Sequence, residues 1–245
     1  MGTFEDLLDE AAGVPVEGWD FSWFDGRATE QRPSWGYARM VGERMARAGA
    51  ALDVQTGGGE VLATVPEPPA LLVAVEAWRP NGLVAARNRR PLGASVVEAG
   101  DALPFRDGVF DLVVSRHPAR TRWDEVARVL RPGGTFLSQQ IGPGTNRELS
   151  EAMMGPLPRP EPQRFDRLAA EAGLDVVDLR AERLRVEFFD VAAVAYFLRK
   201  VVWTVPDFSI ERFRPQLREV HDRIERDGVF VSHSRRVLVE AVKGG

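Results

Sequence analysis

The 245-residue sequence contains no cysteine, which excludes disulfides, thiolate nucleophiles and cysteine-ligated metal sites. Its three histidines, His117, His221 and His233, are too scattered to indicate a metal site, so we predict no bound metal. Neither sign of charge dominates, because 32 Lys and Arg residues are mixed with 36 Asp and Glu residues, for a net charge of -4. Without a basic stripe, a long nucleic acid is not the expected partner.

Long apolar runs and an export signal are also missing. The most apolar late stretch, residues 191–205, is interrupted by Arg199 and Lys200 well before the ~20 residues that a membrane-spanning helix needs. The first twelve residues are acidic and lack the basic-then-apolar order of a secretory signal. We therefore expect no membrane partner and a cytoplasmic protein.

From residue 50 onward, short apolar runs alternate with amphipathic stretches, which is typical of βαβ units around a buried parallel sheet. The expected strands cover residues 50–54, 71–75, 95–98, 110–115, 135–139, 174–187 and 229–242. The expected helices cover residues 37–47, 58–65, 80–88, 122–130, 163–172, 191–202 and 210–226. The sequence thus predicts an α/β protein.

A chain of this length can bury one large core, so we predict a single domain over residues 1–245. Its expected parts are an N-terminal cap over 1–49, a cofactor-binding core over 50–141, a Pro- and Gly-rich lid or loop over 142–162, and the C-terminal half of the sheet over 163–245, with a helical insertion at 188–228. The cap is rich in aromatic residues, among them Trp19, Trp23, Phe24 and Trp35.

Four strand ends carry the residues that point to a ligand. Residues 51–60 form a strand that runs into a Gly-rich turn, where glycine allows sharp turns and close approach to a ligand. Glu76 ends the next strand, either as an acceptor for a ribose diol or as an exposed strand-end acid. Asp101 and Ala102 follow the third strand and could pair with an adenine edge, and Asp111 opens the fourth. Ligands of such sheets bind at the carboxyl ends of the strands.

The stretch from Ala51 to Ile141 resembles the class I S-adenosylmethionine-dependent methyltransferases. The segments 101–105 (DALPF), 110–115 (FDLVVS) and 128–135 (RVLRPGGT) are similar to their small-molecule-type subgroup. The resemblance implies a doubly wound, mostly parallel sheet of seven strands with an antiparallel last strand, and S-adenosylmethionine as cofactor.

The resemblance also implies roles for individual residues. Asp53 and the turn Gly57, Gly58 and Gly59 would face the methionine end of the cofactor, Glu76 the ribose, Asp101 and Ala102 the adenine, and Ser115 with Arg116 the floor beneath the methyl group. Gln55 departs from the family pattern, which has a glycine there. Its side chain either crowds the cofactor or turns away and adds a hydrogen bond.

Methyl transfer depends chiefly on aligning and desolvating the acceptor, so a dedicated base is optional. His117 is the candidate base, and its alternative is a loop histidine bonded to backbone. Arg116 pairs with an acidic substrate or, as we favour, with Asp111. The candidate substrate residues, each with a packing or backbone-bonding alternative, are Trp35, Gln139, Gln140 and Tyr196.

We expect an S-adenosylmethionine-dependent methyltransferase with a small-molecule acceptor. One alternative is a degenerate, non-catalytic methyltransferase fold that only binds the cofactor or a partner, because Gln55 disrupts the glycine motif. An RNA methyltransferase is another, which the negative net charge disfavours. An NAD-dependent dehydrogenase fits the glycine spacing less well. No motif indicates an oligomeric state.

Overall fold

The computed structural model describes residues 2–16, 21–89 and 93–245, so Trp19 of the predicted cap lies outside the described residues. The chain divides into two compact units. Unit 1 comprises residues 1–32, 143–161 and 183–235, and unit 2 comprises 33–142, 162–182 and 236–245. Two long strands, β7 (Leu174–Phe188) and β8 (Phe230–Lys243), contribute residues to both units. The single-domain division of the sequence analysis stays a prediction.

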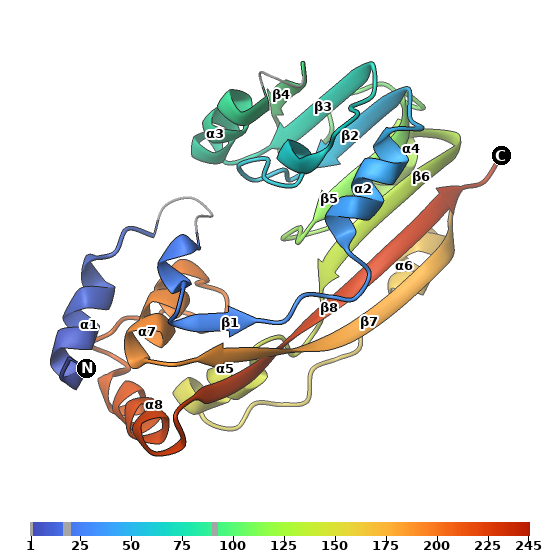
Figure 1. Cartoon of the computed structure of the whole chain (residues 1–245). Helices are drawn as coiled ribbons and strands as arrows, with labels where there is room; N and C mark the ends of the chain where they lie inside the picture. Colours follow the sequence, from blue (N-terminus) through green and yellow to red (C-terminus); the bar gives the residue numbers. More distant parts are fainter. Residues whose placement is uncertain (1, 17–20, 90–92) are drawn as a thin grey trace. The chain divides into compact units, whose positions relative to one another are not determined.

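Unit 2 contains a mostly parallel sheet. β2 (Ala50–Val54), β3 (Leu71–Glu76), β4 (Ser95–Glu98), β5 (Phe110–Arg116) and β6 (Leu130–Ile141) run parallel, and β8 pairs antiparallel with β6. The full strand order is β1-β7-β8-β6-β5-β2-β3-β4. The doubly wound topology and the antiparallel last strand are confirmed (Figure 1).

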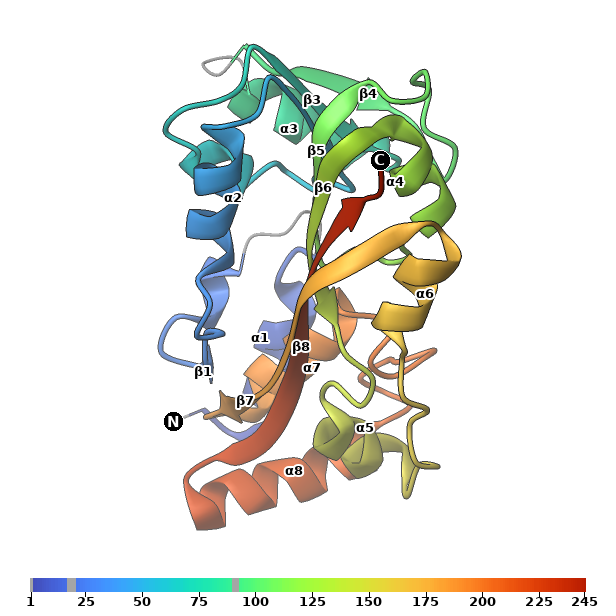
Figure 2. The ribbon, with the colours of Figure 1, turned by 90° about the vertical axis from the view of Figure 1, so that its right-hand side faces the viewer.

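Helices cover both faces of this sheet, which explains why its strands are apolar on both sides. α2 (Tyr37–Met45) packs on one face together with the short 3-10 helix η2 (Leu62–Thr64). α4 (Trp123–Val129) and α6 (Phe165–Glu171) pack on the other face, as Figure 2 shows. α3 (Arg79–Arg89) connects β3 with β4.

The sheet has eight strands rather than the predicted seven. The additional strand, β1 (Ala28–Glu30), is only three residues long and pairs antiparallel with the end of β7 in unit 1, with Ala28 opposite Phe188. Such a short edge strand gives almost no alternating pattern, so sequence periodicity does not reveal it.

The helix predicted at 58–65 is wrong, because only η2 forms there. Gly57 and Gly59 adopt left-handed backbone angles, with φ of 62° and 79°, and keep the chain in a turn. The Asn88 side chain donates to the Gly58 carbonyl at 2.9 Å, so this carbonyl is satisfied without a helical bond.

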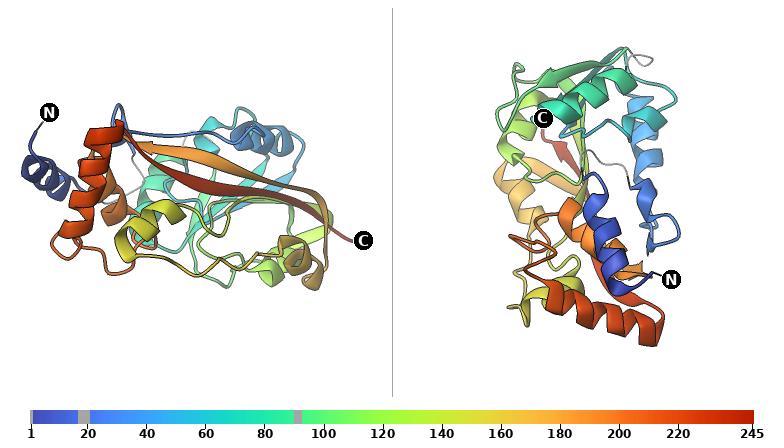
Figure 3. Two further views of the ribbon diagram at one scale, coloured as in Figure 1. Left: turned by 90° about the horizontal axis from the view of Figure 1, so that it is seen from below. Right: turned by 90° about the vertical axis from the view of Figure 1, so that its left-hand side faces the viewer.

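Unit 1 is largely helical. It contains α1 (Phe4–Gly13), η1 (Ser22–Phe24), α5 (Arg147–Met154), α7 (Val191–Lys200) and α8 (Arg214–Asp227). α7 is almost entirely buried and contacts α1 and α8 (Figure 3). Thus the predicted insertion contains two helices, and the predicted lid segment contains α5. None of the helices in the described ranges has the length and apolarity needed to cross a bilayer.

Helix α1 was not predicted from the sequence, although its start has a clear signal. Thr3 and Asp6 form a capping box: the Thr3 side chain accepts from the Asp6 amide, and the Thr3 amide donates to the Asp6 carboxylate at 2.8 Å. Phe4, Leu8 and Ala11 supply its buried face at helical spacing.

Candidate functional site

A cavity of about 290 Å³ lies in unit 2 where the carboxyl ends of β2, β3 and β5 meet the segment that follows β4. Four of the predicted site residues line it: Gln55, Glu76, Asp101 and Ser115. The remaining lining residues are Val54, Val75, Ala77, Trp78, Ala99, Gly100, Leu103, Pro118, Ala119, Arg120, Thr121, Arg122, Val126 and Phe136. The walls are therefore mainly apolar with a few polar groups, as is usual for small-ligand sites.

The Gly-rich turn and the end of β3 are tied together by Glu76. This buried carboxylate accepts from the Gly57 amide at 2.9 Å and from the Trp78 amide at 2.9 Å, one bond to each oxygen. A carboxylate has about four acceptor sites, so both oxygens keep capacity for a ligand's hydroxyl groups. Gly58 and Gly59 are buried within the turn and do not line the cavity.

Asp53 and Ser115 fix the strand ends beneath the turn. Asp53 is buried and accepts from the Thr56 hydroxyl at 2.6 Å, and Ser115 donates to the Val54 carbonyl at 2.9 Å. Tyr37 of α2 donates to the Ser115 carbonyl at 2.9 Å. Burial raises the pKa of Tyr37 well above its usual range, and the negative charge of Asp53 adds to the effect. The tyrosine is therefore a neutral donor that anchors α2 to the strand ends.

Gln55 occupies a left-handed position, with φ of 57°, which explains why glycine suits this place. Its side chain turns toward the segment after β5. The Gln55 amide donates to the Arg120 carbonyl at 2.6 Å and accepts from the Ala119 amide at 2.8 Å. The glutamine thus bonds backbone on one side of the cavity.

The loop after β4 is shaped by an ion pair on α4. Arg128 donates to the Leu103 and Phe105 carbonyls at 2.9 and 2.7 Å and pairs with Glu125, which in turn accepts from the Leu103 amide at 2.7 Å. These bonds hold the loop that carries Asp101. Asp101 itself is exposed and lines the cavity, whereas Ala102 is exposed and does not.

His117 lies at the end of a bonded chain of side chains. Trp35 donates from Nε1 to Gln139 Oε1 at 2.8 Å, and Gln139 Nε2 lies 2.9 Å from His117 Nε2. Because an indole N–H can only donate, the amide oxygen must face Trp35 and the amide nitrogen must donate to His117. The proton of the neutral imidazole then resides on Nδ1.

Burial lowers the pKa of His117 to about 2, and the positive charges of Arg236 and Arg116 add to it. The histidine is therefore neutral, and its Nε2 lone pair is already engaged by Gln139. His117 as a base stays a prediction, and this bonding does not favour it.

The other predicted substrate residues, His117 and Arg116 do not line the cavity. Gln140 is buried and donates to Thr121 at 2.9 Å, and Tyr196 lies in the core of unit 1, where its hydroxyl donates to the Pro15 carbonyl. Trp35, Gln139, Arg116 and His117 do not line the cavity either. The expected pair of Arg116 with Asp111 is wrong, because Asp111 accepts from Arg131 at 2.7 Å.

The wall formed by residues 118–122 was not predicted from the sequence. Their side chains match no motif, so their position shortly after the end of a strand was the one signal that could have indicated them. Trp78, two residues beyond the acid of β3, was also missed for this reason. It is about half exposed and lines the cavity.

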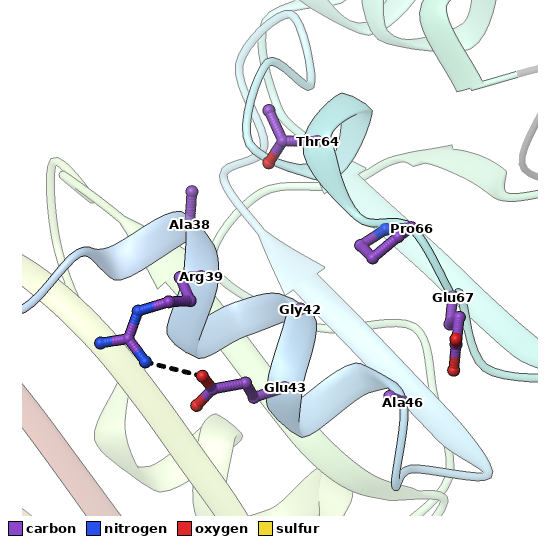
Figure 4. Close-up of a pocket in the computed structure, with 8 residues that line it drawn as sticks. All are labelled: Ala38, Arg39, Gly42, Glu43, Ala46, Thr64, Pro66 and Glu67. Atoms are coloured by element: carbon purple, nitrogen blue, oxygen red, sulfur yellow. Dashed lines mark hydrogen bonds and ion pairs between the residues drawn. The ribbon is translucent and has the colours of Figure 1, made fainter.

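A second hollow of about 450 Å³ lies along α2 and the segment after η2 (Figure 4). Its most polar feature is a pair between Arg39 and Glu43, 2.6 Å apart, at the solvent-facing side of one helix. None of the residues predicted for a site lines this hollow. The cavity at the strand ends is therefore the candidate site.

Part of unit 2 is similar to a known protein family. Residues 52–138, which run from within β2 to most of β6, match a family model described as a methyltransferase domain. No curated protein sequence matches the chain.

Solved structures with a similar fold include a proposed methyltransferase from Bacillus halodurans, with 19% identity, a TM-score of 0.61, and coverage of 85% of this chain and 99% of that chain. A proposed sarcosine dimethylglycine methyltransferase from Galdieria sulphuraria has 14% identity and a TM-score of 0.52 over 98% of both chains. A geranyl diphosphate methyltransferase in complex with S-adenosylmethionine has 14% identity and a TM-score of 0.51 over 84% of both chains. Residues 52–138 are therefore similar to a methyltransferase domain, and the chain shares the Rossmann-like fold of these methyltransferase structures.

Proposed function

We propose that this protein binds S-adenosylmethionine in the strand-end cavity and transfers its methyl group to a small-molecule acceptor. One observation carries the proposal: the polar groups of three strand ends, Gln55, Glu76 and Ser115, line a single cavity together with Asp101. The match of residues 52–138 to a methyltransferase domain supports the choice of cofactor.

The cavity residues fit an adenosyl ligand chemically. Glu76 is buried, held by two backbone amides and open at both oxygens, which suits a pair of ribose hydroxyls. Asp101 is exposed at the cavity wall and can accept from an amino group. We propose that the turn Gly57 to Gly59, with Asp53, lies toward the amino-acid end and that Ala102 lies beside the adenine.

A bound S-adenosylmethionine supplies an electrophilic methyl group on a sulfonium. The protein then has to bring the acceptor into line and exclude water from it. In our proposal Ser115 and Arg116, at the end of β5, lie at the floor beneath the methyl group. The proposed substrate residues remain Trp35, Gln139, Gln140 and Tyr196. In the described structure, Trp35 is already hydrogen-bonded to Gln139, and Gln140 donates to the hydroxyls of Thr121 and Ser138.

The mechanism we propose does not depend on His117 as a base. Its Nε2 already accepts from Gln139, and the low pKa of His117 leaves it a weak base at neutral pH. Alignment and desolvation of an acceptor that is nucleophilic when neutral, or that loses its proton to water, are sufficient.

The acceptor class is the finer part of the proposal. A net charge of -4 with interspersed signs does not suit a polyanion such as RNA. One structural neighbour is named for methyl transfer to sarcosine and dimethylglycine and another for geranyl diphosphate, which are small molecules. These names support a small-molecule acceptor without choosing among them.

The non-catalytic alternative rests on Gln55. Its side chain is turned toward residues 119 and 120, where both ends of its amide are bonded. This arrangement favours a glutamine that is accommodated at this position over one that disrupts the cofactor site.

Calorimetric titration with S-adenosylmethionine and, separately, with S-adenosylhomocysteine tests the proposal. We expect micromolar binding of at least one ligand, and Glu76→Gln should weaken it because a neutral amide loses half of the acceptor capacity. Arg39→Ala, in the other hollow, serves as the control and should bind like the wild type. Absence of binding at millimolar ligand would refute the cofactor assignment.

A further inference from the structure

Residues 118–122, which we call the strap, form one wall of the cavity. All five strap residues line the cavity, and only His117 separates them from the end of β5. The strap begins after His117, whose backbone is left-handed with φ of 52° and whose amide donates to the Gln139 carbonyl at 2.7 Å. Its path across the cavity is fixed by side chains from other strand ends.

Gln55, at the end of β2, makes the closest of these contacts. It bonds two consecutive strap residues through backbone atoms alone: the Ala119 amide donates to Gln55 Oε1 at 2.8 Å, and Gln55 Nε2 donates to the Arg120 carbonyl at 2.6 Å. Both groups of the side-chain amide are therefore used. Because backbone atoms are the partners, the contact does not depend on which side chains the strap carries.

Gln140 of β6 also holds the strap, because its side-chain amide donates to the Thr121 hydroxyl at 2.9 Å. The contacts of the strap with Asp101 are looser. Arg120 Nη1 lies 3.5 Å from Asp101 Oδ2, and Arg122 Nη1 lies 3.9 Å from the same oxygen. Both Arg120 and Asp101 are more than half exposed, and such surface ion pairs contribute little. A ligand can therefore take over the Asp101 carboxylate while the contacts to Gln55 stay in place.

The backbone at residue 55 makes the role of the glutamine specific. A left-handed φ of 57° is strained for any side chain except glycine, asparagine and a few others. A glycine would avoid the strain but could make neither bond to the strap. The glutamine accepts the strained angle and gains two backbone hydrogen bonds at the cavity wall.

We propose that Gln55 is a clasp that fixes the strap as a wall of the cofactor pocket, and is thereby a positioning residue for S-adenosyl ligands. This proposal rests on the proposed function for its ligand. In the clasped form, residues 119 and 120 are already placed when the ligand enters, so binding does not have to order them. Gln55 therefore raises affinity, although it stands where the family pattern has glycine.

The test compares wild type with Gln55→Asn and Gln55→Gly in the full chain. Asparagine tolerates the left-handed backbone but is one methylene shorter, and it cannot reach both strap atoms. Gln163→Asn, the same change at an exposed loop position of unit 2, is the matched control. Two quantities are measured: amide hydrogen exchange of a peptide that contains Ala119, and the dissociation constant of S-adenosylhomocysteine.

We expect exchange at Ala119 to rise by about tenfold or more in both Gln55 variants, and affinity for S-adenosylhomocysteine to fall by about tenfold, because each lost bond is a modest net contribution. Gln163→Asn should change neither quantity. Unchanged exchange in both Gln55 variants would overturn the clasp.

Faster exchange at Ala119 together with equal or tighter binding of S-adenosylhomocysteine in the Gln55 variants would overturn the link between the clasp and ligand binding. Such a result would mean that Gln55 crowds the pocket or has no effect on it. If the wild type binds neither S-adenosylmethionine nor S-adenosylhomocysteine, the proposed function and the ligand part of this proposal both fail. The exchange data would then still decide whether the clasp itself exists.

Discussion

Acidification from pH 6.5 to 5.0 should destabilise the protein through His117. Burial, with Arg236 and Arg116 nearby, lowers the pKa of His117 from 6.5 to about 2, so the folded protein keeps this ring neutral across that range. The unfolded chain binds the proton below pH 6.5, and the free energy of unfolding then falls by about 1.4 kcal/mol per pH unit. The contribution is fully present above pH 6.5 and is lost as the pH falls. The loss by pH 5.0 is about 2 kcal/mol.

The assay is urea unfolding at pH 7.0 and 5.0 for the wild type and for His117→Asn, a residue that tolerates φ of 52° and does not titrate. Carboxylates contribute equally to both proteins, so the wild type should lose about 2 kcal/mol more than the variant. Equal losses would refute a neutral, buried His117.

A second variant separates burial from hydrogen bonding. Trp35→Phe removes the N–H that fixes the orientation of the Gln139 amide, so the amide can rotate and offer its oxygen to a protonated His117. The acid-induced loss should then become smaller than in the wild type. A loss as large as that of the wild type would show that burial and the nearby arginines, and not the orientation of the Gln139 amide, determine the pKa of His117.

Three further substitutions in unit 2, one of them with a control, test packing and hydrogen bonding, each by urea unfolding at pH 7. Arg128→Lys cannot reproduce the fork that holds the Leu103 and Phe105 carbonyls and should cost about 1–3 kcal/mol; no loss would mean that the loop is held elsewhere. Gly134→Ala places a Cβ 2.8 Å from the Arg131 carbonyl and should cost about 1–3 kcal/mol, whereas Gly13→Ala, with nothing within 4 Å, should be near neutral. Tyr37→Phe should cost about 1–2 kcal/mol, because two strand carbonyls lose a buried donor, and a neutral result would contradict that role.

Local sequence patterns were sufficient where one element determines its own structure. The strands at 50–54 and 71–76 are mainly apolar, since helices cover both faces of the sheet, and these strands and the edge strand at 95–98 were each predicted within one residue. Local sequence patterns failed where backbone geometry overrides them. The expected helix at 58–65 is a glycine turn followed by η2, because left-handed angles at Gly57 and Gly59 interrupt helical bonding.

Some residues of the candidate site could be predicted from the sequence and others could not. Glu76, Asp101 and Ser115 were predicted because parallel strands bring their carboxyl ends to one edge of the sheet. The strap was missed because its residues belong to the site only through bonds to distant positions, such as Gln55, 64 and 65 residues away in the chain.

By itself, the sequence determined the fold class, the strands of the core and the sheet edge that carries the candidate site, because hydrophobic periodicity and strand-end chemistry are local properties. The tertiary structure alone decided the direction of Gln55, the tautomer of His117 and the partner of Asp111. Each of these depends on which donor or acceptor the fold brings within about 3 Å. Such pairings join residues that no local pattern relates.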